Sequence, residues 1–150
     1  RGLAAALRLF DLRSLRVFYR VRRSDFVLSM VGFVAVAAGA FGAHALRPRV
    51  TPRLFEVFET GARYQMYHAL ALCLLGVLGL LPARALLSDA LYSASGYGFL
   101  AGTLLFSGSL YALALWGKPW LGMIAPLGGV SFLVGWLCLA LLALSTRGAS

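Results

Sequence analysis

The sequence predicts an all-α integral membrane protein, an antiparallel four-helix bundle with a basic amphipathic helix at its amino terminus. Its 150 residues are 61% hydrophobic and only 13% charged, whereas soluble domains carry about a quarter charged residues. The charges also avoid the apolar stretches, since residues 91–117 and 119–146 contain none. A chain of this length cannot bury so much apolar surface in one water-soluble core. We therefore expect lipid to surround it.

Four apolar stretches are long enough to cross the hydrocarbon core of a bilayer, which takes about 20 residues in a helix. The predicted spans cover residues 26–46, 64–81, 91–116 and 120–144. Together they form one transmembrane domain over residues 26–145, between an extension at 1–25 and a short tail at 146–150.

Individual residues refine the ends of these helices. Thr51 followed by Pro52 predicts the cap and the first position of a short interfacial helix before the second span. Pro126, which two glycines follow closely, predicts a kink inside the fourth span. Cys73 and Cys138 fall at different depths of two spans that run in the same direction, and this argues against a disulfide between them.

The extension at residues 1–25 is rich in arginine and contains only two acidic residues, Asp11 and Asp25. Its apolar residues form a narrow stripe on a helical wheel, which is typical of a helix lying in the head-group plane of a membrane. The same composition is typical of a mitochondrial targeting peptide. We expect a retained helix that contacts anionic lipid or a partner protein. The arginines expected to make these contacts are Arg13, Arg16, Arg20, Arg22 and Arg23.

Small residues recur at helical spacing in three of the spans. Such rows allow helix backbones to approach closely where lipid provides no hydrophobic drive for association. The glycines expected to pack in this way are Gly39, Gly42, Gly98, Gly102, Gly108, Gly128 and Gly129.

Polar residues gather where the first span ends and the second begins. They are His44, Glu59, Tyr64, Gln65 and His68. We expect them to form a structural hydrogen-bond network at one membrane face, with no metal and no cofactor. The alternative is ligation of a metal or a haem by the two histidines, although a metal site usually needs three or four ligands. No catalytic motif is present, so we expect no enzymatic activity.

Four segments carry a family resemblance: GAFGAHAL (39–46), FETGARYQMYHALAL (58–72), GTLLFSGSLYALAL (102–115) and APLGGVSFLVGW (125–136). They resemble the family of small four-helix membrane proteins typified by the bacterial YgdD and YwdK proteins. The resemblance covers roughly residues 27–145 and leaves out the basic extension. It implies a four-helix membrane fold and supplies no activity, because the family is of unknown function.

These observations favour a non-catalytic accessory subunit of a larger membrane complex, plausibly respiratory, that contacts lipids and other subunits. One alternative is a small oligomeric transporter or channel for an uncharged solute, and another is a redox or quinone-binding protein that uses the histidines. The net charge of +9 fits anionic lipid better than nucleic acid, because no soluble domain presents a basic face. The arginine-rich extension favours the mitochondrial inner membrane, with a bacterial plasma membrane as the alternative.

Overall fold

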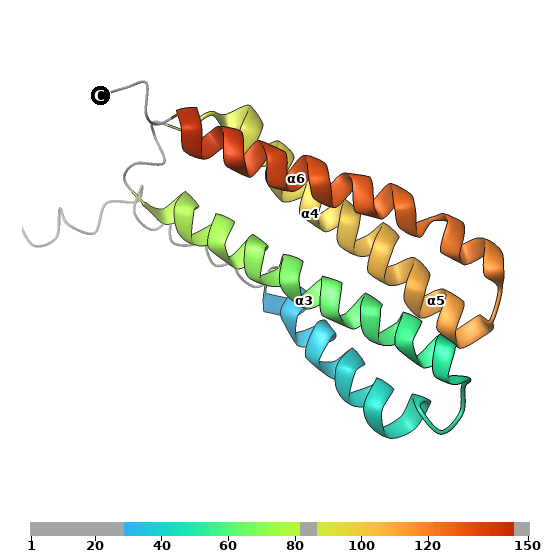
Figure 1. Cartoon of the computed structure of the whole chain (residues 1–150). Coiled ribbons are helices and arrows are strands. Elements are labelled where there is room, and N and C mark those ends of the chain that lie inside the picture. The colour runs from blue at the N-terminus through green and yellow to red at the C-terminus, as the bar shows by residue number, and fades with distance from the viewer. Residues whose placement is uncertain (1–28, 82–86, 146–150) are drawn as a thin grey trace, which may run out of the picture.

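The computed structural model describes residues 29–81 and 87–145, which are almost entirely helical (Figure 1). Three helical stretches are long and apolar enough to cross a membrane: Ser29–Leu46, Asp89–Trp116 and Pro119–Leu144. The extension at 1–25, with the arginines expected to contact lipid or a partner, and the tail at 146–150 lie outside the described residues.

The fourth long helix, α3, runs from Pro52 to Leu80 as one element of 29 residues. Thr51 Oγ1 accepts a hydrogen bond from the Leu54 N–H at 3.4 Å, and Pro52 occupies the first helical position, which confirms the predicted cap. The sequence predicts a short helix that is separate from a span beginning at Tyr64. The two are continuous because no proline lies between Pro52 and Pro82 to interrupt them. Tyr64 therefore lies well inside α3.

The third stretch consists of α4 (Asp89–Gly102), a π-helical turn (Thr103–Ser107) and α5 (Gly108–Trp116). The first helix, Ser29–Leu46, also ends in a π-helical turn, at Gly42–Leu46. Gly117 follows α5 at a φ of 65°, a left-handed conformation that glycine adopts without strain.

The last stretch begins with a 3₁₀ turn at Pro119–Met123 and continues as α6, Ala125–Ser145. Pro126 is the second residue of α6, where a backbone N–H has no intrahelical acceptor in any case. The predicted kink inside the span is therefore replaced by a change of helix type just ahead of the proline.

Close glycine contacts join the helices. A Cβ at Gly98 would lie 2.9 Å from the backbone of Gly135, and a Cβ at Gly42 would lie 3.1 Å from the Phe58 ring. Gly102 lies against Phe132, and Gly128 lies against the backbone of Phe106. The prediction of close packing is wrong for the other three glycines. A Cβ on any of them would meet nothing within 4 Å among the described residues. They are Gly39, Gly108 and Gly129.

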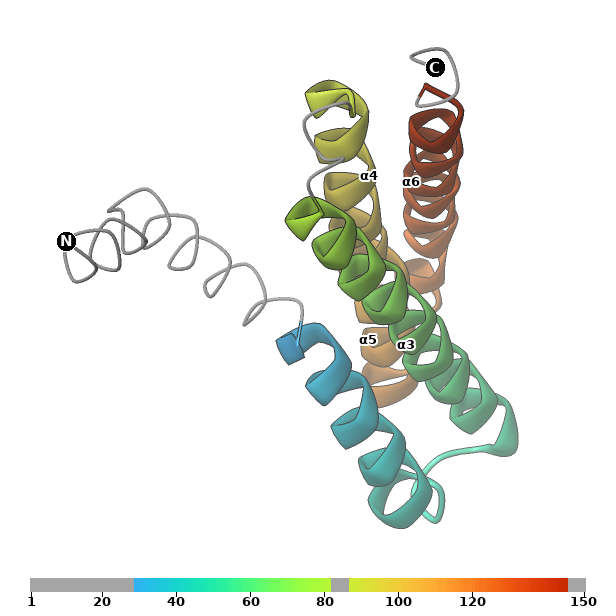
Figure 2. The same cartoon turned by 90° about the vertical axis from the view of Figure 1, so that its left-hand side faces the viewer.

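The helices pack around α3, which crosses in front of α4 and α5 in Figure 2. The first helix runs antiparallel to it, since Gly32 faces Ala69 and Gly42 faces Phe58. One buried cluster joins α3, α4 and α6 through Ala71, Leu72, Phe99 and Phe132. A second joins the first helix, α3 and α5 through Leu46, Phe58 and Ala114.

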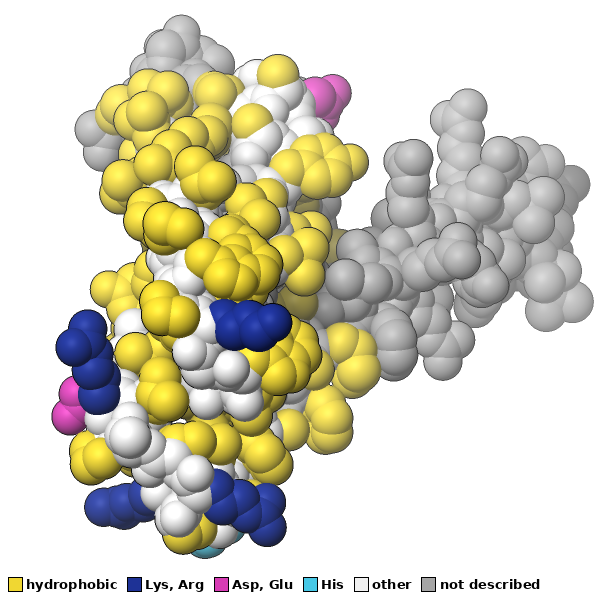
Figure 3. Space-filling model, turned by 90° about the vertical axis from the view of Figure 1, so that its right-hand side faces the viewer, with side chains coloured by type: hydrophobic (Ala, Val, Ile, Leu, Met, Phe, Trp, Pro, Cys, Tyr) yellow, Lys and Arg dark blue, Asp and Glu magenta, His cyan; other side chains and the backbone are white. Residues whose placement is uncertain are grey.

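The outer surface is mostly apolar. Each of the three candidate spans contains a most apolar segment of 18 residues. In these segments only 17%, 33% and 22% of the residues, in chain order, are buried. Hydrophobic side chains cover much of the face in Figure 3, and Lys and Arg side chains lie in its lower half. This surface suits lipid and not water, so the chain is an integral membrane protein. Cys73 and Cys138 are both free thiols, as the sequence predicts.

Candidate functional site

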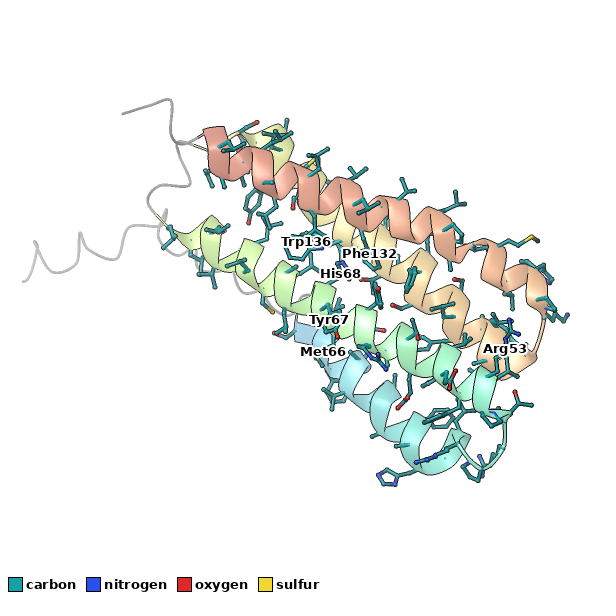
Figure 4. All side chains as sticks on the ribbon, in the orientation of Figure 1. Arg53, Met66, Tyr67, His68, Phe132 and Trp136 are labelled. Carbon is teal, nitrogen blue, oxygen red and sulfur yellow. The ribbon has the colours of Figure 1, made fainter. Side chains whose placement is uncertain are left out.

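His68 lies on the inner face of α3, with 5% of its surface exposed. Its ring stacks on the Phe132 ring of α6, with centroids 3.4 Å apart and planes 4° from parallel (Figure 4). Trp136, one turn further along α6, donates from Nε1 to His68 Nε2 at 3.2 Å. The other ring nitrogen, Nδ1, lies 2.7 Å from the Tyr64 carbonyl oxygen. The imidazole is thus held by one stacked ring and two polar contacts.

These contacts assign the tautomer of His68. An indole N–H can only donate, so Nε2 must accept, and a carbonyl oxygen can only accept, so Nδ1 must carry the proton. The ring is therefore a neutral imidazole with both nitrogens engaged. Ligation of a metal or a haem through Nε2 would require Trp136 to move away. Within residues 29–81 and 87–145 no group of three or more His, Cys, Asp or Glu side chains lies together.

Gln65, one turn before His68, connects three helices. Its Nε2 donates to the Val31 carbonyl oxygen of the first helix at 2.9 Å, and its Oε1 accepts from the Tyr111 hydroxyl of α5 at 2.9 Å. Nearer the carboxyl end of α3, the Tyr92 hydroxyl of α4 donates to the Leu75 carbonyl oxygen at 2.9 Å. Hydrogen bonds of this kind join helices in a membrane, where unpaired polar groups are costly.

The structure brings together three of the five residues of the predicted polar cluster. Tyr64 lies beside His68, with ring centroids 6.3 Å apart, and Gln65 lies one turn away on the same inner face. His44 and Glu59 are exposed and form no hydrogen bond with these three within the described chain. Because α3 already begins at Pro52, the three residues lie near the middle of this helix and not at its start. Gln65 and His68 are buried, whereas Tyr64 is exposed.

Comparison with known proteins identifies the family. A model described as a protein of unknown function, DUF423, matches residues 38–129. The chain belongs to this family. The membrane protein YwdK of Bacillus subtilis, labelled UPF0382, is 40% identical over 110 residues, which are 73% of this chain and 86% of YwdK. The inner membrane protein YgdD of Escherichia coli is 39% identical over 121 residues, which are 79% of this chain and 88% of YgdD. No solved structure matches. The resemblance drawn from the sequence is thereby confirmed.

The residues that match the DUF423 model include Gln65, His68 and Tyr111 but end before Phe132 and Trp136. Sequence reasoning missed these last two and Tyr111. A signal was available in Trp136, which lies inside an apolar span, whereas tryptophan usually marks the membrane interface. Ser107 Oγ is buried without a hydrogen-bond partner in the described part of the chain.

The bond between Gln65 and Tyr111 can be measured by a double-mutant cycle. Tyr111→Phe and Gln65→Met, alone and combined, should give a coupling free energy of about 0.6 kcal/mol, with about 1.7 kcal/mol as the upper limit for such bonds. Unfolding in detergent provides the measurement. Tyr97→Phe is a suitable control, because Tyr97 is 73% exposed and its removal should not couple with Gln65. Strictly additive effects of the two substitutions would contradict the assigned bond.

Proposed function

We propose that this chain crosses the bilayer four times and acts as a non-catalytic subunit of a larger membrane assembly. The observation that carries this proposal is a charged stripe on the outer face of α3, formed by Glu56, Glu59 and Arg63. All three side chains are exposed. Within the described residues no ion pair neutralises them. α3 is not among the three candidate spans, although its 29 residues measure about 44 Å.

Contacts on the inner face of α3 indicate the depth of Arg63. A Cβ at Gly61 would lie 3.3 Å from the Ser107 carbonyl oxygen, and the Tyr64 ring lies 4.8 Å from the Phe106 ring. Gln65 reaches Val31 in the first helix. Arg63 is therefore level with the uncharged interior of the third stretch.

An arginine at this depth is expensive in lipid. Insertion scales assign about 2.5–3.5 kcal/mol to an arginine at the centre of a transmembrane helix. The inner face of α3 packs against the first helix, α4 and α5, so α3 must share their depth in the bilayer. Cover by a partner protein removes this conflict between the charged stripe and the apolar helices beside it. A subunit interface on α3 accounts for the stripe.

The interior supports a packing role. The rings around His68 are in close contact, and the polar side chains there bond one helix to another. This arrangement favours a stable scaffold over a path for a solute or a redox centre.

We propose the bacterial inner membrane as its location. YwdK and YgdD come from bacteria, and YgdD is named an inner membrane protein. This differs from the preference for mitochondria that the arginine-rich extension suggested.

The proposal is tested by purifying the tagged full-length chain from its native membrane in a mild detergent. We expect a particle larger than one chain and stoichiometric recovery of a partner. Arg63→Gln should reduce partner recovery at least tenfold, whereas Arg49→Gln, an exposed change in the loop before α3, should leave it unchanged. A wild-type chain that is monomeric both in detergent and after cross-linking in its native membrane would overturn the proposal.

A further inference from the structure

Most of the Lys and Arg side chains in the described structure gather at one end of the bundle, on the right in Figure 1. They come from the segment that joins the first helix to α3 and from the turn after α5. They are Arg47, Arg49, Arg53 and Lys118, and all four are exposed. The two segments are neighbours, because Leu46 and Ala114, which lie just ahead of them, pack in one buried cluster with Phe58. The four cations therefore form one basic surface.

This basic surface has no acidic partner in the described chain. No ion pair joins any of its four cations to a carboxylate within residues 29–81 and 87–145. The Arg47 guanidinium lies over the Phe55 ring, 5.5 Å from the ring centroid. Such stacking supplies no hydrogen-bond acceptor, so the N–H groups of the guanidinium remain free to bind an anion.

The undescribed parts of the chain do not balance the charge of the basic surface. Residues 1–28, 82–86 and 146–150 together contain nine arginines and two aspartates, so they add positive charge. They also join the described chain at Ser29, Leu81, Leu87 and Ser145, whereas the basic surface lies at the opposite ends of the same helices. The counter-charge therefore comes from outside the chain.

Two tryptophans indicate the depth of the basic surface in the membrane. Trp116 and Trp120 flank Lys118, and they are 69% and 54% exposed. Exposed tryptophans are enriched where the hydrocarbon meets the head groups, since the ring is apolar and its N–H is polar. The phosphate groups of lipids are the anions found at this level.

We propose that the basic surface binds the phosphate groups of anionic phospholipids such as phosphatidylglycerol. A guanidinium matches the geometry of phosphate oxygens, and uncompensated positive charge favours an anionic lipid over a zwitterionic one. Each basic residue near an anionic leaflet strengthens binding about fivefold. This inference goes beyond the proposed function. The basic surface is separate from the charged stripe on α3, so a chain without any partner protein would still bind lipid here.

The inference is tested by titrating the full-length chain in a neutral detergent with dioctanoyl phosphatidylglycerol, with dioctanoyl phosphatidylcholine as the reference lipid. The fluorescence of Trp116 and Trp120 reports binding at this end of the bundle. We expect phosphatidylglycerol to bind about tenfold more tightly or better. Equal affinity for the two lipids would overturn the inference. So would a signal that persists in the double variant Trp116→Phe/Trp120→Phe, because it would come from Trp136.

Neutralisation of the four cations separates this site from the other arginines of the chain. The combined variant Arg47→Gln/Arg49→Gln/Arg53→Gln/Lys118→Gln should lose the preference for phosphatidylglycerol. The matched control replaces the same three arginines by lysine, which keeps every charge and should keep the preference. Each single change to Gln should weaken binding about fivefold, so the test does not depend on folding of the combined variant. A preference that survives neutralisation would overturn the inference.

Inorganic phosphate distinguishes a lipid from a soluble anion as the ligand. Because it lacks acyl chains, it should not displace phosphatidylglycerol when the two are present at equal concentration. Displacement would assign the surface to a soluble phosphate compound and overturn the lipid as ligand. Added sodium chloride should weaken the binding of phosphatidylglycerol, since salt screens exposed charges. Binding that salt does not weaken would contradict the role of the four cations.

Discussion

Gly98→Ala should destabilise the protein by about 1–3 kcal/mol, the usual cost of overpacking a close contact. The new Cβ would lie 2.9 Å from the Cα and N atoms of Gly135 and 3.0 Å from the Ser131 carbonyl oxygen. These are backbone atoms, so no change of rotamer can relieve the clash, and α4 and α6 must move apart. Thermal unfolding in detergent measures the effect.

Gly39→Ala is the matched control. It adds the same methyl group in the first helix, where a Cβ would meet nothing within 4 Å. Alanine favours a helix over glycine by about 1 kcal/mol, so this variant should be as stable as wild type or more stable. If both variants unfold at the same temperature as the wild type, the close approach of α4 to α6 is wrong.

His68→Ala should destabilise the protein by about 3 kcal/mol or more. The substitution removes the ring stacked on Phe132, leaves a cavity, and deprives the Trp136 N–H of its acceptor. Cavity formation by a large buried side chain costs about 2–5 kcal/mol, and a buried donor without a partner adds about 1–3 kcal/mol. Unfolding in detergent again provides the measurement.

His44→Ala is the comparison for His68, because it removes the same side chain from an exposed position in the first helix. Its effect should stay within about 0.5 kcal/mol, as is usual at a surface. Trp136→Phe should fall between the two, since it keeps an aromatic ring but loses the hydrogen bond to His68 and part of the indole's packing. Equal effects of His44→Ala and His68→Ala would contradict the buried site.

The sequence was sufficient for the class of protein and for several local features. Long uncharged stretches require lipid as solvent, and Thr51 with Pro52 correctly predicted the start of α3. The partners of His68 were not predictable in the same way. Phe132 and Trp136 lie on another helix, and only packing determines which of the many apolar residues of α6 face α3.

The course of α3 and the roles of some glycines were misjudged for related reasons. Glu56, Glu59 and Arg63 fall outside the predicted spans, although their spacing also fits one face of a helix that continues into the second span. Gly39, Gly108 and Gly129 allow close approach, but a small residue does not itself provide a neighbour. Both misjudgements concern outward-facing surface, and the sequence of one chain does not specify what covers that surface.

The central claim is that α3 crosses the membrane, and the sidedness of two exposed positions tests it. Arg49→Cys and Lys118→Cys, each made in a chain with Cys73→Ser and Cys138→Ser, place a thiol before α3 and after α5. Both chains are treated with a membrane-impermeant maleimide in sealed, uniformly oriented vesicles, with detergent-opened vesicles as the labelling control. If α3 crosses, the chain passes the bilayer twice between these positions, and the two thiols should react from the same side. Reaction from opposite sides would show a single crossing and contradict the account.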